Sequence, residues 1–110
     1  EEYSFDAFSN LIKDDPLQII VILEEIEKVH LETLIQLRLD SNQAPIDEAQ
    51  FQSLVHKVKG GAQLLQAAGF IHACESLEVD GLLSERIGRF ITLLEEQNQI
   101  IESYRKKLQQ

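Results

Sequence analysis

The fold of this 110-residue chain is decided by residues 14–39, which read Asp14-Asp15-Pro16 followed by LQIIVILEEIEKVHLETLIQLRL. Proline is favoured at the first position of a helix, where its missing N–H is not needed, and the aspartates can cap that end. The apolar residues that follow recur at intervals of three and four, the period of one helix face. We therefore predict a long amphipathic helix over residues 16–39, with a main apolar stripe of Ile19, Ile22, Leu23, Ile26, Val29, Leu34 and Leu37.

The apolar residues in the rest of the chain also recur at helical intervals. Asp47 and Gln50 are spaced as a capping box, and Gly69 and Gly81 are natural stops for the helices before them. These signals predict further helices over about residues 4–13, 47–68, 70–80 and 84–108. Amphipathic helices with short connections predict an all-α fold in one domain, an antiparallel up-down four-helix bundle behind a short N-terminal helix.

The composition of the chain excludes several classes of protein. The formal net charge is −9, from 10 Lys and Arg against 19 Asp and Glu, so phosphate backbones and anionic lipid surfaces are repelled. Neither a nucleic-acid partner nor a membrane contact is expected. The single cysteine, Cys74, cannot form an internal disulfide, and no signal segment or membrane span is evident. We expect a soluble, cytoplasmic, monomeric domain, and the absence of methionine suggests that it was cut from a longer protein.

The predicted helix over residues 47–68 carries an anomaly on its polar side. Its apolar face is formed by Phe51, Leu54, Val55, Val58, Ala62 and Leu65. His56 lies about 150° from the centre of that face and should point outward. The same outer face holds Gln52, Lys59, Gly60, Gln63 and Ala67. Two consecutive glycines, Gly60 and Gly61, interrupt good helix formers at about 0.8–1 kcal/mol each.

A pair of glycines that destabilises its own helix is expected to serve a purpose. Gly60 follows His56 by one turn and removes side-chain bulk beside the imidazole, as expected if another protein must approach the ring closely. Lys59 lies along the same edge and can bring an ammonium group to an anion carried by the ring. An accessible imidazole with cleared surroundings and a nearby cation is what a phosphoryl carrier needs.

The run His56-Lys57-Val58-Lys59-Gly60-Gly61-Ala62 resembles the H-x-x-K-G-[small]-[small] signature of histidine phosphotransfer (HPt) domains. The run Cys74-Glu75-Ser76-Leu77-Glu78 resembles the C-x-x-L-E segment of the following helix in that family. The similarity is greatest to the C-terminal HPt domains of bacterial unorthodox hybrid sensor kinases. One departure is Gln66, where many members have a glycine that ends the motif helix.

The resemblance implies the site's chemistry and its partners. Nε2 of His56 would accept a phosphoryl group from the aspartyl phosphate of a receiver domain and pass it to the aspartate of a response regulator. Mg²⁺ and the acidic pocket would belong to the receiver, so this domain would need no cofactor and have no kinase activity of its own. The parent protein would be an inner-membrane sensor kinase.

The residues also suggest a partner for the imidazole. If the helices 47–68 and 70–80 form a hairpin that turns near residues 67–69, Glu78 faces His56 and Glu75 lies one turn nearer the bend. A carboxylate that accepts from Nδ1–H would leave Nε2 as the nucleophile. The family uses a polar residue at this spacing in that role, which favours Glu78.

Other readings stay open. His30 lies in an apolar stripe, which favours an interior hydrogen-bonded residue. A zinc site through His72 and Cys74 lacks further ligands. Either the first helix or a docking partner could cover the additional apolar residues Leu17, Ile20, Leu31 and Ile35.

Two rival functions compete with the carrier. One is a non-catalytic helical interaction module in which the glycines serve packing and His56 is incidental. The other is the dimerisation and phosphoacceptor domain of a histidine kinase. That domain expects an acidic residue directly after the histidine and a proline soon after, whereas Lys57, Gly60 and Gly61 follow here.

Overall fold

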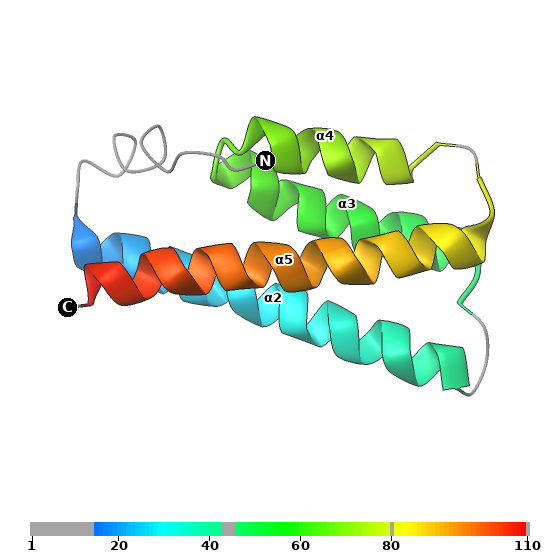
Figure 1. Cartoon of the computed structure of the whole chain (residues 1–110), viewed down its shortest axis with the longest axis horizontal. Helices are drawn as coiled ribbons and strands as arrows, with labels where there is room; N and C mark the ends of the chain where they lie inside the picture. The colour runs from blue at the N-terminus through cyan, green and yellow to red at the C-terminus, as the bar shows by residue number, and fades with distance from the viewer. Residues whose placement is uncertain (1–14, 43–45, 80, 110) are drawn as a thin grey trace.

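The structure, a computed structural model, describes residues 15–42, 46–79 and 81–109. These residues form four helices and no strand, which confirms the all-helical expectation. The helices are α2 (Pro16–Asn42), α3 (Glu48–Leu64), α4 (Ala68–Leu77) and α5 (Leu83–Leu108) (Figure 1). Within the same residues, no helix is both long and apolar enough to cross a membrane. The predicted helix over residues 4–13 lies outside the described part of the chain.

The two long helices, α2 and α5, lie side by side, and the shorter α3 and α4 pack against them (Figure 1). Polar contacts tie α2 to α5 at three levels. Arg105 Nε donates to Glu27 Oε1 over 2.6 Å, His30 Nδ1 donates to Asn98 Oδ1 over 2.7 Å, and Arg38 pairs with Glu95. These contacts fix the relative position of the two helices that support the rest.

The core lies where the apolar stripes of the four helices meet. All six residues predicted for the apolar face of α3 are buried. Three phenylalanines from three helices, Phe51, Phe70 and Phe90, are fully buried, and the rings of Phe51 and Phe90 meet edge to face at 5.6 Å. Packing of this kind adds to the burial of apolar area, so α3 is held with one face inward. The opposite face of α3 is thereby turned to solvent.

His30 is buried in the core, as its place in the apolar stripe of α2 predicts. Its ring meets Phe70 edge to face at 5.6 Å, and its Nε2 is a buried atom without a hydrogen-bond partner among the described residues. Burial lowers the pKa of His30, and the hydrogen bond with Asn98 opposes that shift only in part. His30 is therefore a neutral structural residue rather than a second exposed imidazole.

The turn between α3 and α4 lies earlier than predicted. The N–H of Ala67 donates to the carbonyl of Ala62 over 3.1 Å, and the N–H of Gln66 donates to the carbonyl of Gln63 over 3.0 Å. This is a Schellman motif, which requires a left-handed residue just after the helix. Gln66 takes that conformation with φ 55°. The prediction that α3 continues to residue 68 and stops at Gly69 is therefore wrong, and Gly69 lies inside α4.

The other helix ends differ from the predictions by one to three residues. The helix α2 continues to Asn42 rather than residue 39, and α4 ends at Leu77 rather than residue 80. The connection that follows contains Gly81 at φ 137°, a conformation that side chains rarely adopt. The predicted capping box at the start of α3 is confirmed, because Asp47 Oδ1 accepts from the N–H of Gln50 and Gln50 Oε1 accepts from the N–H of Asp47.

A buried arginine joins three helices, a role that the apolar periodicity did not predict. The guanidinium of Arg86 on α5 donates through Nε to the carbonyl of Leu77 at the end of α4, over 2.9 Å. Its Nη1 and Nη2 donate to the two carboxylate oxygens of Glu48 at the start of α3, over 2.9 and 2.7 Å. The same group lies 5.1 Å from the centre of the Phe51 ring. One side chain thus closes this end of the bundle.

The signal for Arg86 was present in the sequence. It stands four residues before Phe90, at the position where the apolar stripe of α5 would continue, and a charge at such a position needs a partner. The partner is Glu48, whose pKa falls to about 2 because Arg86 and then Gln52 hydrogen-bond its carboxylate.

The left-handed turn residue gives a first prediction. Replacing Gln66 by glycine removes strain of roughly 1–2 kcal/mol and adds unfolded-state entropy worth roughly 0.4–1 kcal/mol. We expect Gln66→Gly to raise the free energy of unfolding by about 0.5–1 kcal/mol in urea denaturation. The matched control is Gln63→Gly, in the last turn of α3, which should lower it by up to about 1 kcal/mol. A destabilised Gln66→Gly variant would contradict the role given to this turn.

The low pKa of Glu48 gives a second prediction. A carboxyl group with a lower pKa in the folded state than in the unfolded state stabilises the fold above its unfolded pKa. That contribution should be lost as the pH falls from about 4.5 to about 2. The difference in urea midpoint between the wild type and Glu48→Gln should therefore be constant at higher pH and shrink across this range. In an Arg86→Met background, where only Gln52 still hydrogen-bonds the carboxylate, the same substitution should show a much weaker pH dependence.

Candidate functional site

His56 stands on the outer face of α3, as its position opposite the apolar residues predicts. Its side chain is exposed, while its neighbours Val55 and Val58 are buried and hold the helix against the core. Within the described part of the chain, His56 makes no hydrogen bond or ion pair. The imidazole is therefore presented to solvent on a rigid support.

The two glycines of α3 have different surroundings. A Cβ atom built on Gly60, one turn after His56, would have no atom from another part of the structure within 4 Å. A Cβ atom built on Gly61 would lie 3.5 Å from Cγ2 of Ile26 on α2, an ordinary contact distance. Gly60 therefore faces open space beside the imidazole, and Gly61 lies where α2 and α3 approach each other. Close packing between helices therefore does not explain why residue 60 is a glycine.

Lys59 lies at the edge of this face with its ammonium group between two carboxylates of α4. Its Nζ is 3.8 Å from Glu78 Oε1 and 3.9 Å from Glu75 Oε2. The Lys59 side chain is only 16% exposed, whereas that of Glu75 is 52% exposed. The ammonium group thus lies close to two carboxylates, beyond direct hydrogen-bond distance, within three residues of His56 along the helix.

The predicted hydrogen bond between His56 and Glu78 is not formed among the described residues. The carboxylate of Glu78 pairs with Lys59 instead, and the Glu78 carbonyl accepts from Gln52 Nε2 over 3.2 Å. The physical reason is the turn at residues 65–67, which lies about two residues earlier than expected. This shift places Glu78 opposite Gln52, one turn before His56.

The residues predicted to contact a partner protein differ in how exposed they are. Gln63 is exposed on the outer face, as expected. Gln52 is half-buried, and besides the Glu78 carbonyl it donates to Glu48 Oε2 over 2.6 Å. Ala67 is fully buried, so its prediction as a partner-binding residue is wrong. Since α3 ends at Leu64, the helical periodicity that placed Ala67 outward no longer applies to it.

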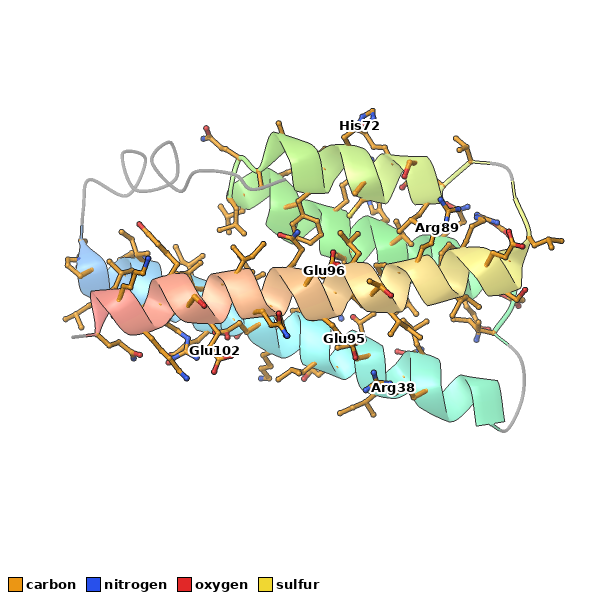
Figure 2. All side chains as sticks on the ribbon, in the orientation of Figure 1. Arg38, His72, Arg89, Glu95, Glu96 and Glu102 are labelled. Carbon is orange, nitrogen blue, oxygen red and sulfur yellow. The ribbon has the colours of Figure 1, made fainter. Side chains whose placement is uncertain are left out.

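Cys74 and His72 of α4 do not form a common site. Cys74 is fully buried and free, and burial raises the pKa of its thiol to about 12, with smaller effects from the charges of Glu78, Lys59 and Glu75. His72 is exposed and points away from the bundle (Figure 2). Among the described residues, no group of three or more His, Cys, Asp or Glu side chains is arranged to hold a metal ion.

An open groove of the surface lies away from the face that carries His56. This groove of about 530 Å³ runs between α4 and α5, and its lining includes Ser76, Arg89 and Glu96. None of the predicted site residues lines this groove. The His56 face is therefore a helix surface suited to contact with another protein rather than a pocket for a small molecule.

Comparison with known proteins gives no independent assignment. No family model, no curated protein and no solved structure matches the chain. The chemistry of the site is therefore judged from its own residues.

The open space at Gly60 gives a third prediction. Gly60→Ala should raise the free energy of unfolding by about 0.8–1 kcal/mol, and Gly60→Gln by somewhat less, because each replaces glycine in a helix without meeting a neighbour. Gly61→Gln is the matched control. Its longer side chain would run into Ile26 and should lower stability by about 1–3 kcal/mol in urea denaturation. Equal destabilisation at both positions would contradict the difference between the glycines.

Proposed function

We propose that this chain is a histidine phosphotransfer domain of a bacterial multistep phosphorelay. His56 accepts a phosphoryl group from the aspartyl phosphate of a receiver domain and passes it to the aspartate of a response regulator. The observation that carries the proposal is an exposed imidazole, without a hydrogen-bond partner among the described residues, on a helix whose other face is buried. It stands one turn before a glycine that faces open space. If His56 were a surface histidine without a function, a glycine at position 60 would have no explanation.

The transfer needs little from this domain beyond the nucleophile. The lone pair of His56 Nε2 attacks phosphorus, the P–N bond forms, and the P–O bond to the donor aspartate breaks, which releases its carboxylate. The Nδ1 proton stays on the ring. In the second transfer the carboxylate of the acceptor aspartate attacks the same phosphorus and the imidazole leaves. The Mg²⁺ that stabilises the charge on the phosphoryl oxygens belongs to the receiver domain.

Lys59 contributes positive charge at the margin of the reaction. Glu75 and Glu78 hold its ammonium group in place when the site is unphosphorylated. When His56 carries a phosphoryl group, the new negative charge competes with these carboxylates for the ammonium group. Glu78 therefore acts through Lys59, in place of the direct contact with His56 that the sequence suggested.

The order of contacts between α2 and α5 supports the proposed antiparallel up-down bundle. Glu27 pairs with Arg105, His30 with Asn98, and Arg38 with Glu95, so residue numbers rise in one helix as they fall in the other. The proposal includes the short helix over residues 4–13 at the N-terminus and a cytoplasmic place in a hybrid sensor kinase. Both rest on the sequence.

The rival interaction module has one observation in its favour. Gly61 lies against Ile26, so one of the two glycines has a packing role. The module does not account for Gly60, which faces open space.

A fourth prediction tests the proposed function. The domain is incubated with a receiver domain carrying labelled aspartyl phosphate, and acid-labile, alkali-stable label is measured on it. His56→Gln should abolish this label without changing the far-ultraviolet circular dichroism or the melting temperature, because the side chain is exposed. His72→Gln, the matched exposed histidine on α4, should keep the label. Label retained on the His56→Gln variant would exclude His56 as the acceptor.

A fifth prediction concerns the cation. Lys59→Ala should slow single-turnover transfer by on the order of 10- to 100-fold without abolishing it, because the nucleophile remains. The effect should be smaller than that of a dedicated donor, since the carboxylates of Glu75 and Glu78 compete with the phosphoryl group for the ammonium group. Lys57→Ala, the exposed lysine beside His56, should leave the rate at saturating receiver unchanged. Equal rates for Lys59→Ala and the wild type would remove Lys59 from the site.

In the same assay, Gly60→Gln should transfer poorly despite its higher stability. Its side chain would occupy the open space beside His56, and a displacement of about 1 Å between reacting atoms can slow a reaction on the order of 100-fold. Normal transfer by this variant would mean that the space beside His56 is not used.

A further inference from the structure

A second surface stands out on α2, on the side turned away from the core. Leu17, Val21, Leu31 and Ile35 are 76%, 62%, 54% and 59% exposed. Glu24 and Lys28 lie between them in the sequence and are also exposed. We call these six residues the outer face of α2. Four large apolar side chains on one exposed helix face are more than a solvated surface needs.

These residues form one narrow stripe. At 100° per residue they fall within an arc of about 80°, centred opposite Ile26. Ile26 is buried and lies next to Gly61 of α3, so the outer face of α2 points away from α3. In Figure 1, the C-terminal half of α2 forms the lower edge of the molecule, and its N-terminal half lies behind α5.

The stripe is complementary to its own reverse, because turning it end for end exchanges the acidic and the basic position. Along α2 the order is apolar, apolar, acidic, basic, apolar, apolar, and the residues are spaced symmetrically about Ile26. If a second copy of α2 is laid antiparallel over the first, Leu17 faces Ile35 of the second copy and Val21 faces Leu31. Glu24 then faces Lys28 of the second copy, and Lys28 faces Glu24. A two-fold axis at the level of Ile26 therefore pairs apolar with apolar and acid with base.

The charges of this stripe are available for such pairing. Lys28 forms no ion pair with a described residue. Glu24 lies 3.9 Å from Arg105 Nη1, and its side chain remains 52% exposed. Exposed pairs at that distance contribute little within one chain. Opposite charges at the centre of two antiparallel helices set orientation and register, as they do in coiled coils.

We propose that the outer face of α2 binds a second copy of this chain, in an antiparallel two-fold dimer. The sequence alone suggested a monomer, but the self-complementary stripe supplies a specific occupant for a face that is otherwise exposed. The contact is one helix face about 27 Å long, which places the dimer at the weak end of protein interfaces. His56 stands on α3, which packs against the opposite side of α2, so the dimer leaves the proposed phosphotransfer face open.

Sedimentation equilibrium of the whole 110-residue chain tests the dimer, over concentrations from about 10 μM to 1 mM that cover the weak range. The average mass should rise from that of one chain toward that of two. Leu31→Glu should stay monomeric with unchanged circular dichroism, because the residue is already exposed. Lys57→Glu, an exposed charge reversal on α3, should dimerise as the wild type does. A wild type that stays monomeric throughout would overturn the proposal.

A charge exchange tests the register. Lys28→Glu and Glu24→Lys should each be monomeric, because each places like charges opposite each other. An equimolar mixture of the two should form a heterodimer, because the two carboxylates of the first variant then face the two ammonium groups of the second. A mixture that stays monomeric, or single variants that dimerise like the wild type, would contradict the antiparallel pairing about Ile26.

One alternative occupant has its own outcome. If the N-terminal segment of the same chain covers the outer face of α2, the full chain should be monomeric and a chain lacking residues 1–14 should dimerise. That result would overturn the dimer of the full chain. Phosphotransfer by His56 is measured separately, so its failure leaves the dimer unaffected, and the converse also holds.

Discussion

The arrangement of α3, α4 and α5 depends on the buried guanidinium of Arg86. It donates hydrogen bonds to a carbonyl at the end of α4 and to both carboxylate oxygens of Glu48 at the start of α3. It also lies over the Phe51 ring. A planar group with several donors can serve two helix ends at once, which an ammonium group cannot do in the same geometry. The contact fixes where α3 begins, and the orientation of its outer face follows from that.

The second constraint is the turn after α3. Because Gln66 adopts a left-handed conformation, α3 ends at Leu64, three residues before Ala67. That shift changes which residues of α4 face which residues of α3. Glu78 meets Lys59 and Gln52 rather than His56, and Ala67 is drawn into the core. A shift of about two residues in a turn thus decides which side chains of α3 the carboxylate of Glu78 can reach.

The molecule has two outward surfaces with different characters. The outer face of α3 combines an exposed imidazole, open space at Gly60 and a lysine held by two carboxylates. The outer face of α2 is apolar with one acid and one base at its centre. The two helices pack through Ile26 and Gly61, so the surfaces point in different directions. A partner docked at one face would not obstruct the other.

Local patterns in the sequence were enough to predict the helical class, the capping box of α3, its buried face and the outward direction of His56. These follow from local chemistry and from a period of 3.6 residues, which act within one helix and need no knowledge of its neighbours. The tertiary structure decided the partner of Arg86, the left-handed turn at Gln66 and the pairing of Lys59 with Glu75 and Glu78. Each of these depends on the distance between residues of different helices or on a backbone angle at a helix end. Hydrophobic periodicity contains neither quantity, because it records which side of a helix is buried and not which residue of the next helix lies against it.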